Sequence, residues 1–76
     1  MNSNFDNILL FKTNIQTTAD MHYVQPVLDR HPQIAKWSID MDDDDRVLRI
    51  TSSSLTHTHV IDMVALHGYQ CEELKD

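Results

Sequence analysis

Histidine and cysteine are the residue types in this chain best suited to chemistry, and it contains five histidines and one cysteine. Two of the histidines, His57 and His59, lie close together. They fall where we place the start of a helix, and side chains two positions apart on a helix point about 200° apart. A zinc ion needs roughly three or four ligands, and no third ligand adjoins this pair. We therefore expect both histidines to be solvent-exposed.

The other histidines, His22, His31 and His67, stand singly in the sequence. His67 comes directly before Gly68, where we place the end of a helix. A cation in the last helical turn suits the negative end of the helix dipole, so we interpret His67 as a structural residue.

An acidic run, Asp42-Asp43-Asp44-Asp45 with Asp40 before it, could attract calcium or magnesium. However, the run has neither the glycine nor the distal glutamate of a calcium-binding loop. We interpret it as the solvated tip of a turn between two strands, where charge also discourages edge-to-edge aggregation.

The lone cysteine, Cys71, cannot form an internal disulfide bond, which fits a reducing compartment. We interpret its thiol as a small buried hydrophobe rather than a nucleophile. No paired carboxylates or activated serine stand out. Gly68 is the single glycine, so the chain cannot form a glycine-rich loop around a phosphate. We therefore predict that the protein is not an enzyme and has no cofactor.

Twelve acidic residues against six Lys and Arg residues give a formal net charge of −6. The basic residues are scattered, so neither nucleic acid nor an anionic membrane is expected as a partner. No apolar stretch reaches the ~18 residues that span a membrane. Residues 1–7 lack the basic start and long apolar run of a signal peptide. We therefore predict a cytoplasmic protein.

The first half of the chain predicts a strand and a helix. Residues 8–15 are rich in apolar and β-forming side chains, which is typical of a strand. One of two threonines, Thr17 or Thr18, caps a helix over residues 18–30, which Pro26 should kink. The apolar face of this helix combines three residues with one from the preceding turn: Val24, Val27 and Leu28, with Ala19 or Tyr23.

The second half predicts two strands, a helix and a last strand. Residues 34–41 alternate between apolar and polar side chains, and residues 46–52 form the second arm of a hairpin. Thr56 caps a helix that ends at Gly68, before a short strand over residues 69–74. Trp37 is expected in the core, or, if it lies on the open face of the sheet, as a contact residue.

This order of elements, β-α-β-β-α-β, predicts an α+β fold. With right-handed crossovers it gives a ferredoxin-like sandwich: a four-stranded antiparallel sheet with both helices on one face. We expect one domain over residues 1–76, ordered over about 8–74. One core should contain residues from both helices and the second strand: Val24, Leu28, Ile39 and Val64.

Several landmarks resemble those of the heavy-metal-associated domains of copper chaperones and metal pumps. The turn His31-Pro32-Gln33-Ile34, the strand end Ile39-Asp40-Met41 and the helix end Gly68-Tyr69 fall at the separations found in that family. The resemblance covers roughly residues 10–71. It places the family signature, Gly-Met-Thr-Cys-x-x-Cys, on residues 14–20.

The departure from the family is chemical. Thr17 and Asp20 occupy the two cysteine positions, and copper(I) selects soft thiolate ligands, so tight copper(I) binding is not expected. Tyr69 matches a family tyrosine that shields the metal site. Lys12 falls where the family has an apolar residue, so a register shifted by one residue stays open, with four residues facing inward: Leu9, Phe11, Thr13 and Ile15.

The resemblance implies a small protein-binding or regulatory module without a metal. In the family, the loop before the first helix and the start of that helix dock onto a partner. The matching residues here are Gln16, Thr17, Thr18, Asp20, His22 and Tyr69. Two alternatives stay open. One is a hard or mixed metal site drawn from Asp20, His22, His67 and Tyr69; the other is a small-molecule enzyme or sensor on the open sheet face.

Overall fold

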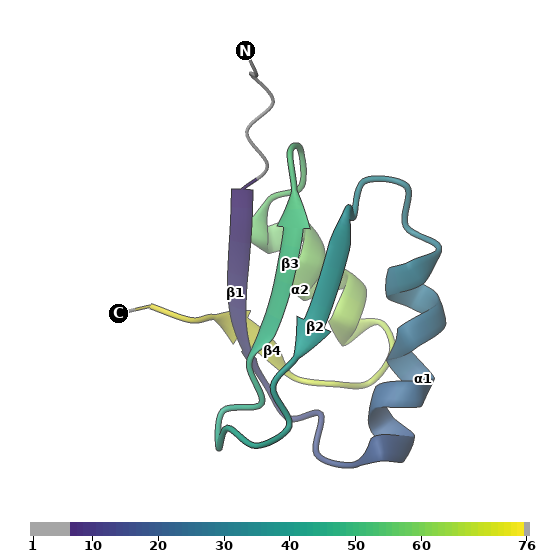
Figure 1. Cartoon of the computed structure of the whole chain (residues 1–76), viewed down its shortest axis with the longest axis vertical. Helices are drawn as coiled ribbons and strands as arrows, with labels where there is room; N and C mark the ends of the chain where they lie inside the picture. The colour runs from purple at the N-terminus through teal and green to yellow at the C-terminus, as the bar shows by residue number, and fades with distance from the viewer. Residues whose placement is uncertain (1–6, 76) are drawn as a thin grey trace.

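The computed structural model of the chain describes residues 7–75. Six elements follow in the predicted order (Figure 1): β1 (Asn7–Thr13), α1 (Thr18–Asp29), β2 (Lys36–Ile39), β3 (Leu48–Ser52), α2 (His57–Ala65) and β4 (Cys71–Glu73). The prediction that residues 1–7 are not part of a signal peptide falls almost wholly on residues 1–6, which lie outside the described range. Within that range, no helix combines the length and apolar character needed to cross a bilayer.

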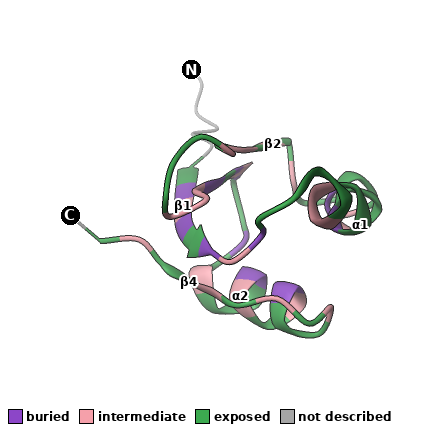
Figure 2. Ribbon diagram, turned by 90° about the horizontal axis from the view of Figure 1, so that it is seen from below, coloured by how far each residue is buried: buried purple, intermediate pink, exposed green. Residues whose placement is uncertain are grey.

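The strands form one sheet in the order β2-β3-β1-β4, and every neighbouring pair is antiparallel. Each helix connects two strands that are not direct neighbours, and both helices cover the same face (Figures 1 and 2). The other face of the sheet is open. This confirms the predicted ferredoxin-like sandwich.

The shifted register of β1 is the one that the structure adopts. Leu9 pairs with Ile50 and Phe11 pairs with Leu48, and all four side chains are buried. Lys12 is exposed. Side chains alternate between the two faces of a strand. The Lys12 ammonium group therefore stays in water only in the register in which the residues on either side of it, Phe11 and Thr13, face the core.

One hydrophobic core lies between the sheet and the two helices. The predicted core residues Val24, Leu28 and Val64 are buried, and Ile39 packs against them at the margin. The prediction that Ala19 or Tyr23 completes the apolar face of α1 is wrong, since Ala19 is exposed and Tyr23 is 59% exposed. Met21, three residues before Val24, packs there instead.

The segments next to the strands are held by hydrogen bonds outside the ladders. Two hydrogen bonds join Asn14 and Gln70. The backbone amide of Asn14 donates to the carbonyl oxygen of Gln70, and the backbone amide of Gln70 donates to Asn14 Oδ1 over 2.8 Å. Trp37 packs against the core, and its indole Nε1–H donates to Asp29 Oδ1 at the end of α1 over 2.7 Å. The indole therefore fastens β2 to α1 and is not a contact residue on the open face.

Candidate functional site

The loop between β1 and α1 is closed by a capping box. Thr17 is the N-cap of α1, and its hydroxyl accepts a hydrogen bond from the amide of Asp20 over 3.0 Å. In return, Asp20 Oδ2 accepts from the amides of Thr17 and Gln16, each over 3.1 Å. These bonds satisfy backbone donors that a helix start leaves free. The two residues at the family's cysteine positions therefore hold the helix start.

Tyr69 joins this loop from the other half of the chain. Gly68 adopts a left-handed φ of 90° after α2, as a closing glycine does, and turns the chain toward the loop. The hydroxyl of Tyr69 then donates to Asp20 Oδ1 over 2.9 Å, between residues 49 positions apart. The Asp20 carboxylate thus bridges the start of α1 and the segment after α2.

The same hydrogen bonds decide the charge states of the pair. The hydrogen bond from Tyr69 lowers the pKa of Asp20, with further lowering by the Gln16 amide. Donating that hydrogen bond to Asp20 raises the pKa of Tyr69 above its ordinary value, and partial desolvation of the phenol adds to the rise. At neutral pH the site therefore holds a carboxylate and a protonated phenol. The two carboxylate oxygens already accept three hydrogen bonds, which leaves only about one of the roughly four lone-pair positions of the carboxylate for a metal ion.

An aromatic cluster beside the loop was missed in the sequence. The ring of Tyr23 lies 6.1 Å from that of Tyr69 and 6.3 Å from that of His67, centre to centre. Tyr23 follows Asp20 by three positions on α1, and residues so spaced lie on neighbouring parts of a helix surface. That spacing is the signal that could have indicated the cluster, whereas the helical periodicity offered Tyr23 only as an alternative to Ala19 on the apolar face of α1.

The predicted site residues lie together only in part. Gln16, Thr17, Thr18 and His22 are exposed, and Asp20 and Tyr69 are half-buried. His22 has no hydrogen bond or ring contact to this cluster within the described residues. His67 meets Tyr23 rather than Asp20, and its Nδ1 lies 2.9 Å from the carbonyl oxygen of Met63. That contact satisfies a carbonyl of the last helical turn, but α2 ends at Ala65, so His67 lies beyond the turn in which it was expected to act as a cation.

The histidines at the opposite end of the helices correct two predictions. His57 is half-buried, with its ring 5.3 Å from that of Phe11 and its Nε2 3.8 Å from a carboxylate oxygen of Glu73, so it is not simply solvent-exposed. His59 is exposed as predicted. His31, which stands alone in the sequence, has a partner in the fold, because its Nε2 atom lies 3.4 Å from the Nε2 atom of His59.

A hydrogen bond accounts for the His31–His59 pair better than a metal does. The Gln33 amide donates to His31 Nδ1 over 3.1 Å, so the proton of a neutral His31 ring is on Nε2, facing His59. A histidine that binds a metal normally donates a hydrogen bond through its other nitrogen, whereas here that nitrogen accepts one. Within residues 7–75, no three histidine, cysteine or acidic side chains are arranged to hold a metal ion.

Cys71 and the acidic run behave largely as predicted. Cys71 is half-buried against the core, and burial, with a smaller effect of the Glu72 charge, raises the pKa of its thiol to about 12. The thiol is therefore protonated at neutral pH and a poor nucleophile. Residues 42–44 are exposed, while Asp45 is half-buried near the Lys12 ammonium group, 3.9 Å away. The run is thus the tip of the β2–β3 connection.

The comparisons with known proteins support the fold. No family model matches the chain, and no curated protein matches its sequence. Among solved structures, the crystal structure of oxidised MerP from Ralstonia metallidurans CH34 is similar, with a TM-score of 0.77. The match covers 93% of this chain and 100% of that chain, at 11% sequence identity. At this identity the likeness shows a shared fold, which supports the heavy-metal-associated-like architecture inferred from the landmarks.

The lowered pKa of Asp20 predicts a specific pH dependence of stability. We expect Asp20→Asn to reduce the free energy of unfolding at pH 7, because an amide cannot accept all the hydrogen bonds of the carboxylate. A depressed pKa stabilises the fold above the unfolded value of 3.8, and this contribution is lost as pH falls through the folded pKa. The difference between wild type and variant should therefore shrink in acid.

Urea unfolding of both proteins at neutral pH and near pH 3 measures this difference. Asp44→Asn is the matched control, since Asp44 is exposed at the tip of the β2–β3 connection. It removes the same charge and should change stability little at either pH. Equal pH dependence for the two variants would show that the Asp20 network does not stabilise the fold.

Proposed function

We propose that this protein is a non-catalytic docking module that binds a partner protein through the end of the molecule bearing the β1–α1 loop. We call this surface the docking face. It consists of the predicted residues and one that the structure adds: Gln16, Thr17, Thr18, Asp20, His22, Tyr69 and Tyr23. The proposed compartment is the cytoplasm.

The observation that carries the proposal is exposed apolar surface. Ile8, Tyr23 and Leu66 are the large hydrophobic side chains exposed within residues 7–75, and two of them belong to this end. Tyr23 is 59% exposed on the docking face, and Leu66, 84% exposed, directly precedes the histidine that contacts Tyr23. Tyrosine is enriched at protein interfaces because it combines a large apolar ring with a hydroxyl.

The hydrogen bonds of the loop favour binding over chemistry. Gln16 and Thr17 are held at their amides by Asp20, and Asp20 is held by Tyr69. A surface fixed in this way loses little conformational entropy when a partner docks, which helps affinity. The site contains no thiol and no unengaged carboxylate. These features favour recognition rather than catalysis.

Metal handling is the second candidate, because the chain shares its fold with MerP. The residues available for it are Asp20, His22, His67 and Tyr69, of which Asp20 and Tyr69 bond to each other. A zinc titration followed by NMR separates the two functions. Saturable shifts confined to residues 20–23 and 67–69 at micromolar zinc would favour a metal site over a docking face.

The docking proposal is tested by comparing three baits in an extract of the source cells. The test variant, Thr18→Arg with Tyr23→Ala, adds a bulky cation to the docking face and removes its exposed ring. The control variant, Thr58→Arg with Ile8→Ala, makes matching changes at exposed positions elsewhere. We expect wild type and control to recover a shared protein that the folded test variant loses. Equal recovery by all three, or recovery by none, would contradict the proposal.

A further inference from the structure

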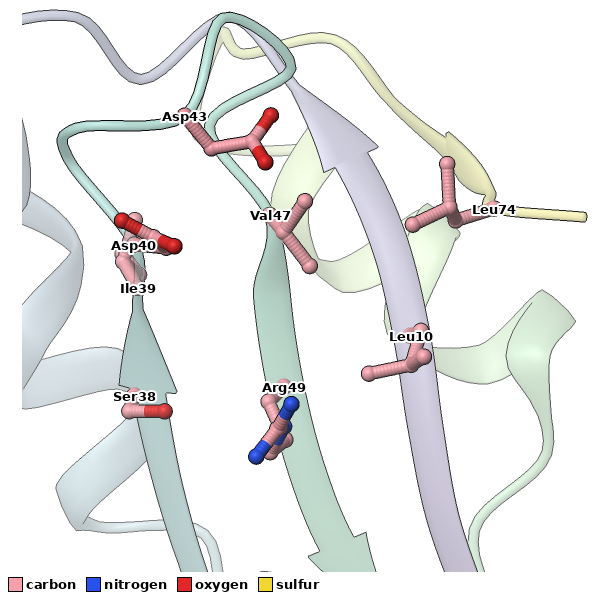
Figure 3. A pocket seen from close by; sticks show the side chains of 8 residues that line it. All are labelled: Leu10, Ser38, Ile39, Asp40, Asp43, Val47, Arg49 and Leu74. Carbon is pink, nitrogen blue, oxygen red and sulfur yellow. The ribbon is translucent and has the colours of Figure 1, made fainter.

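The open face of the sheet carries a group of hydrogen-bond donors that neither the fold nor the docking face uses. Side chains on this face come from alternate positions of β1, β2 and β3. Figure 3 shows Ser38 and Arg49 projecting to the same side of the sheet as Leu10. A shallow hollow of about 370 Å³ lies here, lined by Leu10, Ser38, Ile39, Asp40, Asp43, Val47, Arg49 and Leu74.

A second hollow, of about 240 Å³, adjoins the first and shares Ser38 and Arg49 with it. Its other lining residues are Lys36, Trp37 and Thr51. The strand register explains how four polar side chains meet there. Lys36 pairs directly with Thr51, and Ser38 pairs directly with Arg49, across β2 and β3. Directly paired residues in an antiparallel ladder have Cβ atoms roughly 5 Å apart.

Within the part of the chain that the structure describes, these four side chains have no side-chain hydrogen bond or ion pair. Within residues 7–75, ion pairs join Lys12 to Asp45 and His57 to Glu73, and neither includes Lys36 or Arg49. No side-chain hydrogen bond of the described residues involves Ser38 or Thr51. Among the described residues, the second hollow therefore combines two cations that have no ion-pair partner with two hydroxyl groups.

The charges around this group are unevenly distributed. Asp40 and Asp43 line the first hollow, on the side toward the β2–β3 connection. The second hollow has no acidic residue in its lining. Asp40 lies two residues beyond Ser38, roughly 7 Å along an extended strand. An anion would therefore be attracted to the Lys36 side of Arg49 and repelled from its other side.

We propose that the second hollow binds the phosphate group of a small molecule. A phosphate monoester carries nearly two negative charges and three acceptor oxygens at neutral pH. The Arg49 guanidinium can bind two of these oxygens side by side, and the Lys36 ammonium supplies the second positive charge. The hydroxyls of Ser38 and Thr51 can donate to the remaining lone pairs. A carboxylate, with one charge and two oxygens, matches this set of donors less well.

NMR titration of the full chain with inorganic phosphate, at constant ionic strength and slightly alkaline pH, tests the site. We expect saturable amide shifts confined to residues 36–38 and 49–51, and no such shifts with acetate. Arg49→Gln and Lys36→Gln should each weaken binding about tenfold, because each removes a charge-assisted contact. Lys12→Gln, an equal charge change in a strand of the same sheet, should leave binding unchanged.

The alternatives each give a different outcome. Equal shifts with phosphate and acetate, or shifts spread over all basic residues, would show general charge attraction and overturn the proposal. An equal loss of phosphate binding in Lys12→Gln and Arg49→Gln would also overturn the proposal. So would a titration in which no amide shift saturates. If phosphate binds, glycerol phosphate is compared next. Tighter binding of glycerol phosphate assigns the site to an organic phosphate, and equal binding assigns it to the free ion.

Discussion

Replacing Val24 by aspartate is expected to leave most of the chain unfolded at room temperature. Val24 is 3% exposed and packs on the inner side of α1. A carboxylate buried there without a partner costs several kcal/mol. A domain of this size has a total stability of only about 5 kcal/mol, because it buries a modest fraction of its surface. The cost and the available stability are therefore comparable.

Circular dichroism and thermal melting measure this effect, and the neighbouring position provides the control. Gln25→Asp introduces the same residue one position further along α1, where the side chain is exposed. It should keep its helical signal and melt within a few degrees of wild type. A Val24→Asp protein that melts like Gln25→Asp would contradict the packing of α1 on the sheet.

Placing cysteines at the two capping positions is expected to create tight copper(I) binding that the wild type lacks. Thr17 and Asp20 are the N-cap and the third helical residue of α1, three positions apart. Two thiolates at these positions would supply the soft ligands that copper(I) selects. The substitution removes the capping box and the Tyr69 contact. The loss of the cap itself is expected to cost about 1 kcal/mol.

Competition with a coloured copper(I) chelator measures the binding, and Cys71→Ser in all proteins removes the native thiol. The matched control is Thr17→Ser with Asp20→Ser, which also loses the carboxylate but adds no sulfur. We expect the double-cysteine protein to withdraw copper from the chelator and the double-serine protein to leave it. A folded double-cysteine protein that does not compete would mean that the alignment of residues 14–20 with the family signature is wrong.

The fold and many of its local signals could be predicted because they depend on neighbouring residues. Thr56 was expected to be the N-cap of α2, and the cap of α1 was narrowed to Thr17 or Thr18. The hydroxyls of Thr17 and Thr56 each accept from the amide three residues on. Gly68 was expected to take a left-handed conformation, and it does. Alternation and helical periodicity then indicated the order of the six elements. Such signals survive in a single sequence because their partners lie within a few residues.

The strand and helix faces were less certain from sequence. Lys12 left two registers for β1, and the buried pair of Phe11 and Leu48 decides between them. Tyr23 looked like part of the apolar face of α1, yet its ring stands beside Tyr69. Periodicity alone cannot separate these cases, because a tyrosine suits both the edge of a core and an interface.

The sequence by itself determined the α+β sandwich, the cap of α2 and the absence of the cysteine pair. The tertiary structure alone decided which distant side chains meet. His31 reaches His59, Trp37 reaches Asp29, and the ring of Tyr23 stands beside that of Tyr69. The same holds for Arg49, whose neighbours on the open face follow from strand pairing. The physical reason is that such contacts depend on the register and crossing of elements, which the whole core sets and no local pattern encodes.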